Sequence, residues 1–119
     1  MLTNTEITSD IIQAMQDKKG KKIVIIDLSE LETAPTHKFI ICEGKSTSQV
    51  AAIADSIRDR LLEDKKIKPY NYTGYQNAQW IVLDYGDTFV HIFHPESRNF
   101  YNIEELWSDA PTELIPDID

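Results

Sequence analysis

The chain has 119 residues, of which 41% are hydrophobic, and it carries a formal net charge of −8 and a single cysteine. This length suits one compact domain, because a single hydrophobic core becomes adequate at roughly 100 to 150 residues, and we expect no second catalytic domain. No apolar run approaches the ~20 residues needed to cross a bilayer, and Cys42 has no disulfide partner within the chain. Residues 1–6 lack the pattern of a signal or transit peptide. We therefore expect a cytoplasmic protein without a membrane partner.

The negative charge is concentrated in the second half of the chain. Residues 1–66 hold 11 acidic and 10 basic side chains, whereas residues 67–119 hold nine acidic and only two basic ones, Lys68 and Arg98. Nucleic-acid phosphates attract proteins that neutralise them with Lys and Arg. The charge therefore disfavours direct nucleic-acid binding and favours a basic protein partner.

The first half predicts a helix, two strands and a second helix. The first helix has its apolar face on Ile7, Ile11, Ala14 and Met15, after the capping-box spacing of Thr3 and Glu6. The β-branched runs at 23–26 and 39–42 are typical of strands covered on both faces. Ser46 and Gln49 then open a second helix, whose apolar stripe is Val50, Ile53, Ala54, Ile57 and Leu61.

The second half predicts three strands, at 68–72, 80–84 and 88–93, and a short helix at 103–107 with Leu106 and Trp107 packing inward. Tyr85-Gly86-Asp87 between the last two strands is a hairpin turn. The order α-β-β-α-β-β-β-α indicates an α/β (α+β) domain, with a mixed sheet of about five strands flanked by helices. We expect a single domain over residues 1–107 and an acidic, mobile tail over 108–119.

Three candidate chemical sites have simpler structural explanations. Gly44-Lys45-Ser46 precedes a helix, where backbone N–H groups favour an anion, but the spacing of a phosphate-binding loop is absent. His91 and His94 are three residues apart, which on a strand places them on opposite faces and disfavours a shared metal. Cys42 lies within an apolar run and is expected to be a core residue. We expect no metal, cofactor or catalytic residue.

The strand at 80–84 offers a better candidate, a docking surface. Strand alternation places Trp80, Val82 and Asp84 on one face and Ile81, Leu83 and Tyr85 on the other. One face thus combines an aromatic ring with a carboxylate. That composition is expected of a docking surface for a basic protein.

The second half also resembles a known family signature. Its two parts are Trp80-Ile81-Val82-Leu83-Asp84-Tyr85-Gly86-Asp87 and Val90-His91-Ile92-Phe93-His94-Pro95-Glu96-x-Arg98-x-x-Tyr101-x-x-Glu104-x-Leu106-Trp107. Together with Gly44-x-Ser46, Val50 and Ile53-Ala54-Asp55, they closely resemble the Iojap-type ribosomal silencing factors. The likeness spans roughly residues 7–107.

The resemblance implies a non-catalytic factor with a fold similar to nucleotidyltransferases but without their catalytic carboxylates. It implies binding to the large ribosomal subunit through protein fourteen of that subunit, which sterically blocks joining of the small subunit and represses translation under nutrient limitation. The free protein is expected to be a monomer or a homodimer. The partner-binding residues proposed on this basis are Trp80, Asp84, Tyr85, Asp87, His94, Glu96 and Tyr101. The alternatives are a nucleotidyltransferase-like enzyme using Gly44 and Ser46, and a general acidic adaptor for another basic protein.

Overall fold

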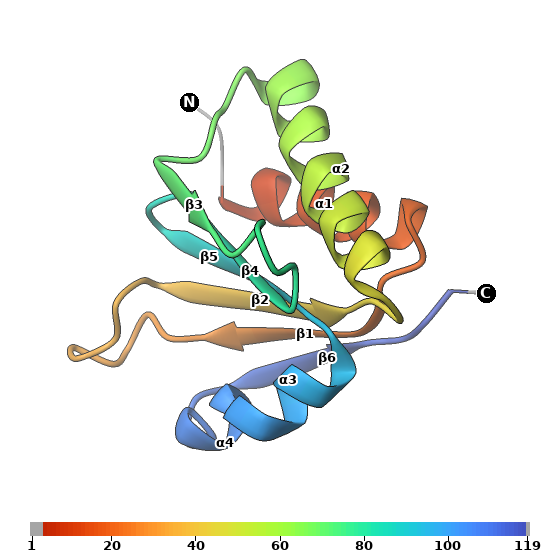
Figure 1. Cartoon of the computed structure of the whole chain (residues 1–119). Helices are drawn as coiled ribbons and strands as arrows, with labels where there is room; N and C mark the ends of the chain where they lie inside the picture. Colours follow the sequence, from red (N-terminus) through yellow and green to blue (C-terminus); the bar gives the residue numbers. More distant parts are fainter. Residues whose placement is uncertain (1–3, 119) are drawn as a thin grey trace.

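A single six-stranded mixed sheet organises the molecule in the computed structural model, which describes residues 4–118 (Figure 1). The strands are β1 (Lys21–Asp27), β2 (Lys38–Glu43), β3 (Asn71–Thr73), β4 (Trp80–Asp84), β5 (Thr88–Phe93) and β6 (Thr112–Ile115). The helices are α1 (Asn4–Asp17), α2 (Thr47–Lys65), α3 (Pro95–Tyr101) and α4 (Ile103–Leu106). The strand order across the sheet is β3-β4-β5-β2-β1-β6, in which only β2 and β5 are parallel neighbours.

The helices lie in two layers on opposite faces of the sheet. In Figure 1, α1 and α2 lie above the sheet, whereas α3 and α4 lie below it. The upper core joins α2 side chains such as Ile53 and Ile57 to sheet residues such as Ile81 and Leu83. This arrangement confirms the expected class, a mixed sheet flanked by helices.

Local sequence explains why the second helix begins where it does. The Ser46 hydroxyl accepts a hydrogen bond from the Gln49 N–H at 3.1 Å, as the N-cap pattern predicts. All five residues of the predicted apolar stripe are buried, so the helix docks on the sheet through the face that its periodicity indicates. The Thr3–Glu6 capping pair lies partly outside the described residues, because Thr3 is not among them.

The C-terminal segment corrects one prediction. Residues 112–115 form β6, which pairs with β1 and adds a sixth strand where a mobile tail was expected. The Asp117 carboxylate extends this docking by accepting a hydrogen bond from the Lys22 N–H at 2.8 Å. The strand was not predicted, because it is short and exposed and because Pro111 and Pro116 on either side of it indicated a loop. Proline is nevertheless tolerated at the edge of a sheet, where β6 lies.

The segment after β5 corrects two more expectations. An additional helix, α3, begins at Pro95, a residue that suits the first helical position because its missing N–H would have no partner there. Trp107 packs inward against Phe39, with ring centroids 6.1 Å apart, as expected. Leu106, which was also expected inward, is 74% exposed, because the four-residue helix α4 places only one side on the sheet.

Candidate functional site

The candidate docking surface lies on the lower face of the sheet, opposite α1 and α2. Antiparallel register places Trp80 opposite Phe93, Val82 opposite His91 and Asp84 opposite Phe89. We call the accessible part of this face the aromatic surface; it consists of Trp80, Val82, Asp84, Phe89 and Tyr101. The prediction that Trp80 and Asp84 share one face is confirmed.

Stacked rings hold the centre of the aromatic surface. The Trp80 ring lies 4.9 Å from Phe93, at an interplanar angle of 22°, and also 4.9 Å from Tyr101. Phe93 is fully buried, whereas Tyr101 is 53% exposed. Such aromatic pairs are worth about 0.5–1.5 kcal/mol each beyond the area they bury. Trp80 therefore connects the buried Phe93 ring to the exposed Tyr101 ring, and the three rings form one packed aromatic unit.

His91 lies beneath this unit and contacts it through a hydrogen bond. The Trp80 indole Nε1–H donates to His91 Nδ1 at 3.1 Å. His91 is only 5% exposed, and burial lowers its pKa to about 3. The imidazole is therefore neutral at physiological pH. It belongs to the aromatic cluster and was not among the residues predicted for partner binding.

Asp84 serves the hairpin as well as the surface. One oxygen of its carboxylate accepts a hydrogen bond from the Gly86 N–H at 2.8 Å, and Gly86 adopts φ +85°, as the predicted turn requires. Asp87, at the exposed tip, lies 3.7 Å from the ring of His37. The carboxylate of Asp84 thus has one oxygen engaged in the turn and a half-buried position on the surface.

Tyr85 lies away from the aromatic surface. Its ring packs against the core between α2 and the sheet. Its hydroxyl is buried without a hydrogen-bond partner among the described residues, and burial raises the pKa of this hydroxyl. A partner on the opposite face of the sheet has no access to that hydroxyl. Tyr85 therefore serves core packing, and we leave it out of the proposed surface.

His94 and Glu96 lie at the start of α3. The His94 ring accepts a hydrogen bond from the Glu96 N–H at 3.3 Å through Nδ1, so this histidine caps the helix. The Glu96 side chain is exposed in the first turn, where a negative charge complements the helix dipole. His94 therefore has a structural role, while Glu96 contributes an accessible negative charge near the surface.

The helix start at Gly44–Ser46 has its own internal partners. The Lys45 N–H donates to the Gln49 side-chain oxygen at 2.6 Å, and the Gly44 N–H donates to the Phe93 carbonyl at 2.9 Å. These N–H groups are therefore already satisfied by the chain itself. Within residues 4–118, no group of three or more His, Cys, Asp or Glu side chains is placed to hold a metal ion.

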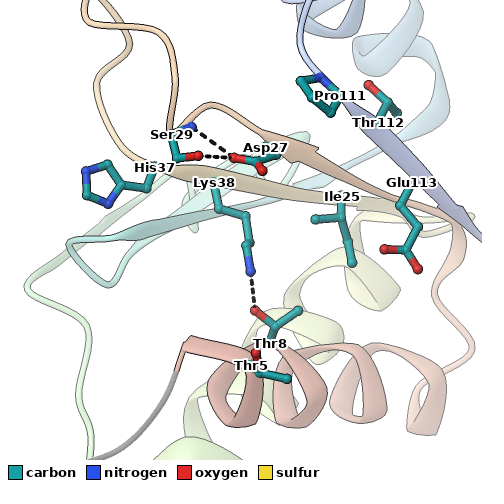
Figure 2. A pocket seen from close by; sticks show the side chains of 10 residues that line it. All are labelled: Thr5, Thr8, Ile25, Asp27, Ser29, His37, Lys38, Pro111, Thr112 and Glu113. Atoms are coloured by element: carbon teal, nitrogen blue, oxygen red, sulfur yellow. Dashed lines mark hydrogen bonds between the residues drawn. The ribbon is translucent and has the colours of Figure 1, made fainter.

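A separate cavity of about 600 Å³ lies between α1 and strands β1, β2 and β6 (Figure 2). In this view the Lys38 ammonium points at the Thr8 hydroxyl, to which it donates a hydrogen bond at 2.9 Å. Asp27 accepts hydrogen bonds from the backbone and hydroxyl of Ser29, which lower its pKa. None of the residues predicted for partner binding lines this cavity.

Comparison with known proteins identifies the family. The family model described as "Ribosomal silencing factor during starvation" matches residues 2–119. The chain belongs to the ribosomal silencing factor family. A curated relative, ribosomal silencing factor RsfS of Halalkalibacterium halodurans, is 35% identical over 111 residues, which cover 93% of each chain. The chloroplastic protein Iojap of Zea mays is 39% identical over 80 residues, which cover 66% of this chain and 34% of the maize protein.

A solved structure supports the same assignment. A protein from Chromobacterium violaceum superposes with a TM-score of 0.84 at 34% identity, covering 90% of this chain and 88% of that one. Among the described residues of this family member, no helix is both long enough and apolar enough to span a bilayer. The names of the relatives describe a regulatory factor of the ribosome.

Two strongly exposed apolar residues on α3 and α4 of this silencing factor were not among the residues predicted for partner binding. Phe100 on α3 is 81% exposed, and Leu106 on α4 is 74% exposed. Phe100 also contacts Tyr101 edge-to-face, with centroids 5.0 Å apart, and so extends the apolar area beside the aromatic surface. The available signal was Pro95, which suits the first position of a helix and could have indicated that a helix begins there.

Arg98 holds the two C-terminal helices onto the sheet of this silencing factor. Its side chain is only 9% exposed and contacts Glu104 at 2.7 Å and Glu43 at 3.2 Å. With Arg98 engaged internally, the vicinity of the aromatic surface presents Asp84 and Glu96 without an exposed arginine beside them.

Proposed function

We propose that this chain is a non-catalytic factor of the cytoplasm that binds the large ribosomal subunit through protein fourteen of that subunit. Bound there, it occupies the space where the small subunit docks, and it represses translation when nutrients are limiting. Steric blocking requires no chemical reaction. The repressing activity then depends only on how much of the large subunit is occupied.

The observation that carries this proposal is the contact between the Trp80 and Tyr101 rings, 4.9 Å apart, on a sheet face that α1 and α2 leave uncovered. Tryptophan and tyrosine are enriched among the residues that dominate binding energy at protein interfaces. Both rings are held by packing before a partner arrives, so little side-chain entropy remains to be lost on binding. Membership of the silencing factor family supplies the ribosome as the target.

Charge supports a basic partner at this surface. Asp84 lies on the aromatic surface, and the exposed Glu96 and Asp87 lie on the adjoining α3 and hairpin. Carboxylates placed at the rim of an interface mainly raise the association rate with a basic partner, whereas buried aromatic rings slow dissociation. The acidic rim would thus steer the encounter and the Trp80–Tyr101 unit would set the residence time.

Replacing Trp80 tests the proposal. Trp80→Ala should weaken binding to purified large subunits by roughly thirtyfold or more, the loss typical of a central aromatic contact. Tyr70→Ala is the matched control, because Tyr70 is 83% exposed and is not part of the aromatic surface. Circular dichroism checks that both variants fold. Wild-type affinity in a folded Trp80→Ala protein would refute the proposed surface.

Replacing Asp84 separates its charge from its role in the hairpin. Asp84→Asn keeps an oxygen for the Gly86 N–H while removing the charge, whereas Asp84→Lys reverses the charge. We expect slower association for Asp84→Asn and a larger loss for Asp84→Lys, with both differences shrinking as salt is raised. Asp59→Lys on α2 is the matched control, because Asp59 is exposed on the opposite side of the sheet. Equal effects of Asp59→Lys and Asp84→Lys would show that only net charge matters.

A further inference from the structure

His91 is the buried polar group to which the proposed function assigns no role. It lies at the centre of the lower sheet face, between Val82 on β4 and Ile41 on β2. Its Nδ1 accepts the hydrogen bond from the Trp80 indole, and the Phe39 ring meets it edge-to-face with centroids 4.4 Å apart. The ring is thus fixed on several sides by aromatic packing.

The hydrogen bond defines the tautomer of this imidazole. Because Nδ1 accepts a hydrogen bond from the Trp80 indole N–H, the ring proton of neutral His91 is on Nε2. Nε2 is buried and has no hydrogen-bond partner among the described residues. An unsatisfied buried donor opposes folding. Within residues 4–118, the imidazole thus makes a single hydrogen bond, the one with Trp80.

The plane of the Trp80 indole and its orientation within that plane are two separate features. The stacked contact with Phe93, at an interplanar angle of 22°, fixes the plane. A half-turn about χ2 keeps the indole in nearly the same plane, because this torsion is roughly two-fold, but it exchanges the edge that carries the N–H and the edge that carries the six-membered ring. A specific acceptor at one edge distinguishes the two orientations, and His91 Nδ1 supplies that acceptor.

We propose that His91 is a positioning residue for partner binding, which selects one of the two coplanar orientations of Trp80 and so determines the edge of the indole that the partner meets. This inference rests on the proposed function, since it assigns a role through Trp80. His91 itself is buried beneath the aromatic surface and touches no partner.

Replacing His91 by asparagine or by leucine, two side chains of similar shape, separates the effect of the hydrogen bond from the effect of packing. Asn has an oxygen close to the place of Nδ1, whereas Leu has nearly the shape of Asn but no acceptor. The chain has two tryptophans, so the two indole N–H signals in a proton–nitrogen correlation spectrum can be assigned with Trp80→Phe. We expect the Trp80 signal to remain near its wild-type position in His91→Asn and to move and exchange faster with water in His91→Leu.

Binding to purified large subunits supplies the second readout. His91→Leu should lose roughly fivefold in affinity, which corresponds to one neutral hydrogen bond, and His91→Asn should recover most of it. In a Trp80→Phe background, His91→Leu should cause no further loss, because its effect passes through the indole.

The outcomes separate the two proposals. If Trp80→Ala loses binding while His91→Leu binds like the wild type, the role of His91 is wrong and the proposed surface stands. If His91→Leu costs as much in the Trp80→Phe background as alone, His91 acts through general packing and the inference is overturned. If Trp80→Ala binds normally, the proposed surface itself fails, and the role of His91 in binding fails with it.

Discussion

The buried His91 should make the stability of the fold depend on pH between 7 and 5. In the unfolded chain a histidine has a pKa of about 6.5, whereas burial among aromatic rings lowers the folded pKa of His91 to about 3. Between these values the unfolded state binds a proton that the folded state does not. The free energy of unfolding therefore falls as the pH falls below 6.5, and the loss is complete only near pH 3.

The magnitude follows from the two pKa values. The slope in this window is about 1.4 kcal/mol per pH unit. Because only part of the unfolded chain is protonated near pH 6.5, the change from pH 7 to pH 5 amounts to about 2 kcal/mol. Ordinary carboxyl groups titrate mainly below pH 5, and the pKa values of Asp10 and Asp27 are lowered further by their hydrogen-bond partners.

Urea unfolding followed by circular dichroism measures this change directly. The wild type should lose about 2 kcal/mol between pH 7 and pH 5, whereas His91→Leu should lose far less, because it has no buried imidazole to protonate. His37→Asn is the control, because it removes a histidine whose side chain is 65% exposed. The same loss in His91→Leu as in the wild type would refute the assignment of the effect to His91.

Three further predictions concern the structure around the aromatic surface. Arg98→Met should lower the free energy of unfolding by about 3 kcal/mol in urea, because it leaves the nearly buried Glu43 without its partner. Arg60→Met should lower it by about 1 kcal/mol or less, because the ion pairs of Arg60 are more exposed. Equal losses in the two variants would contradict this ranking. Hydrogen exchange should show protected amides within residues 112–115, which pair with β1, and exchange at the rate of an unstructured peptide would contradict the strand. Cys42, fully buried and with its pKa raised to about 12, should react with a thiol reagent only after unfolding; rapid labelling of the native protein would contradict its burial.

The central strands were predictable because they carry a signal that is local in sequence. The β-branched runs at 23–26 and 39–42 lie in β1 and β2, and their register places them in the middle of the sheet. A strand covered on both faces has to be apolar throughout, so its composition reveals it. The hairpin was equally accessible, because Gly86 provides the positive φ that the turn needs.

The edge strand β6 and the helix α3 were not predictable in the same way. The strand β6 is mostly exposed, so its residues show no apolar pattern. It exists because β1 offers an unpaired edge, and this condition arises only after the sheet has formed. The helix α3 is seven residues long, which is too short for helical periodicity to be recognised.

The candidate site shows the same division between local and long-range information. Alternation along one strand correctly placed Trp80 with Asp84 and placed Tyr85 on the other face. The contact between Trp80 and Tyr101 joins residues 21 positions apart and depends on how α3 folds back beneath the sheet. Likewise, nothing local indicates that the His91 ring accepts the indole hydrogen bond, because two side chains on neighbouring strands make it.

Sedimentation through a sucrose gradient tests the central claim most directly. Purified protein is mixed with large subunits, small subunits are added, and the gradient separates free subunits from joined ribosomes. We expect the wild-type protein to migrate with the large subunit and to reduce joined ribosomes, and Trp80→Ala to do neither. A wild-type protein that remains at the top of the gradient while subunits join freely would contradict the proposed function.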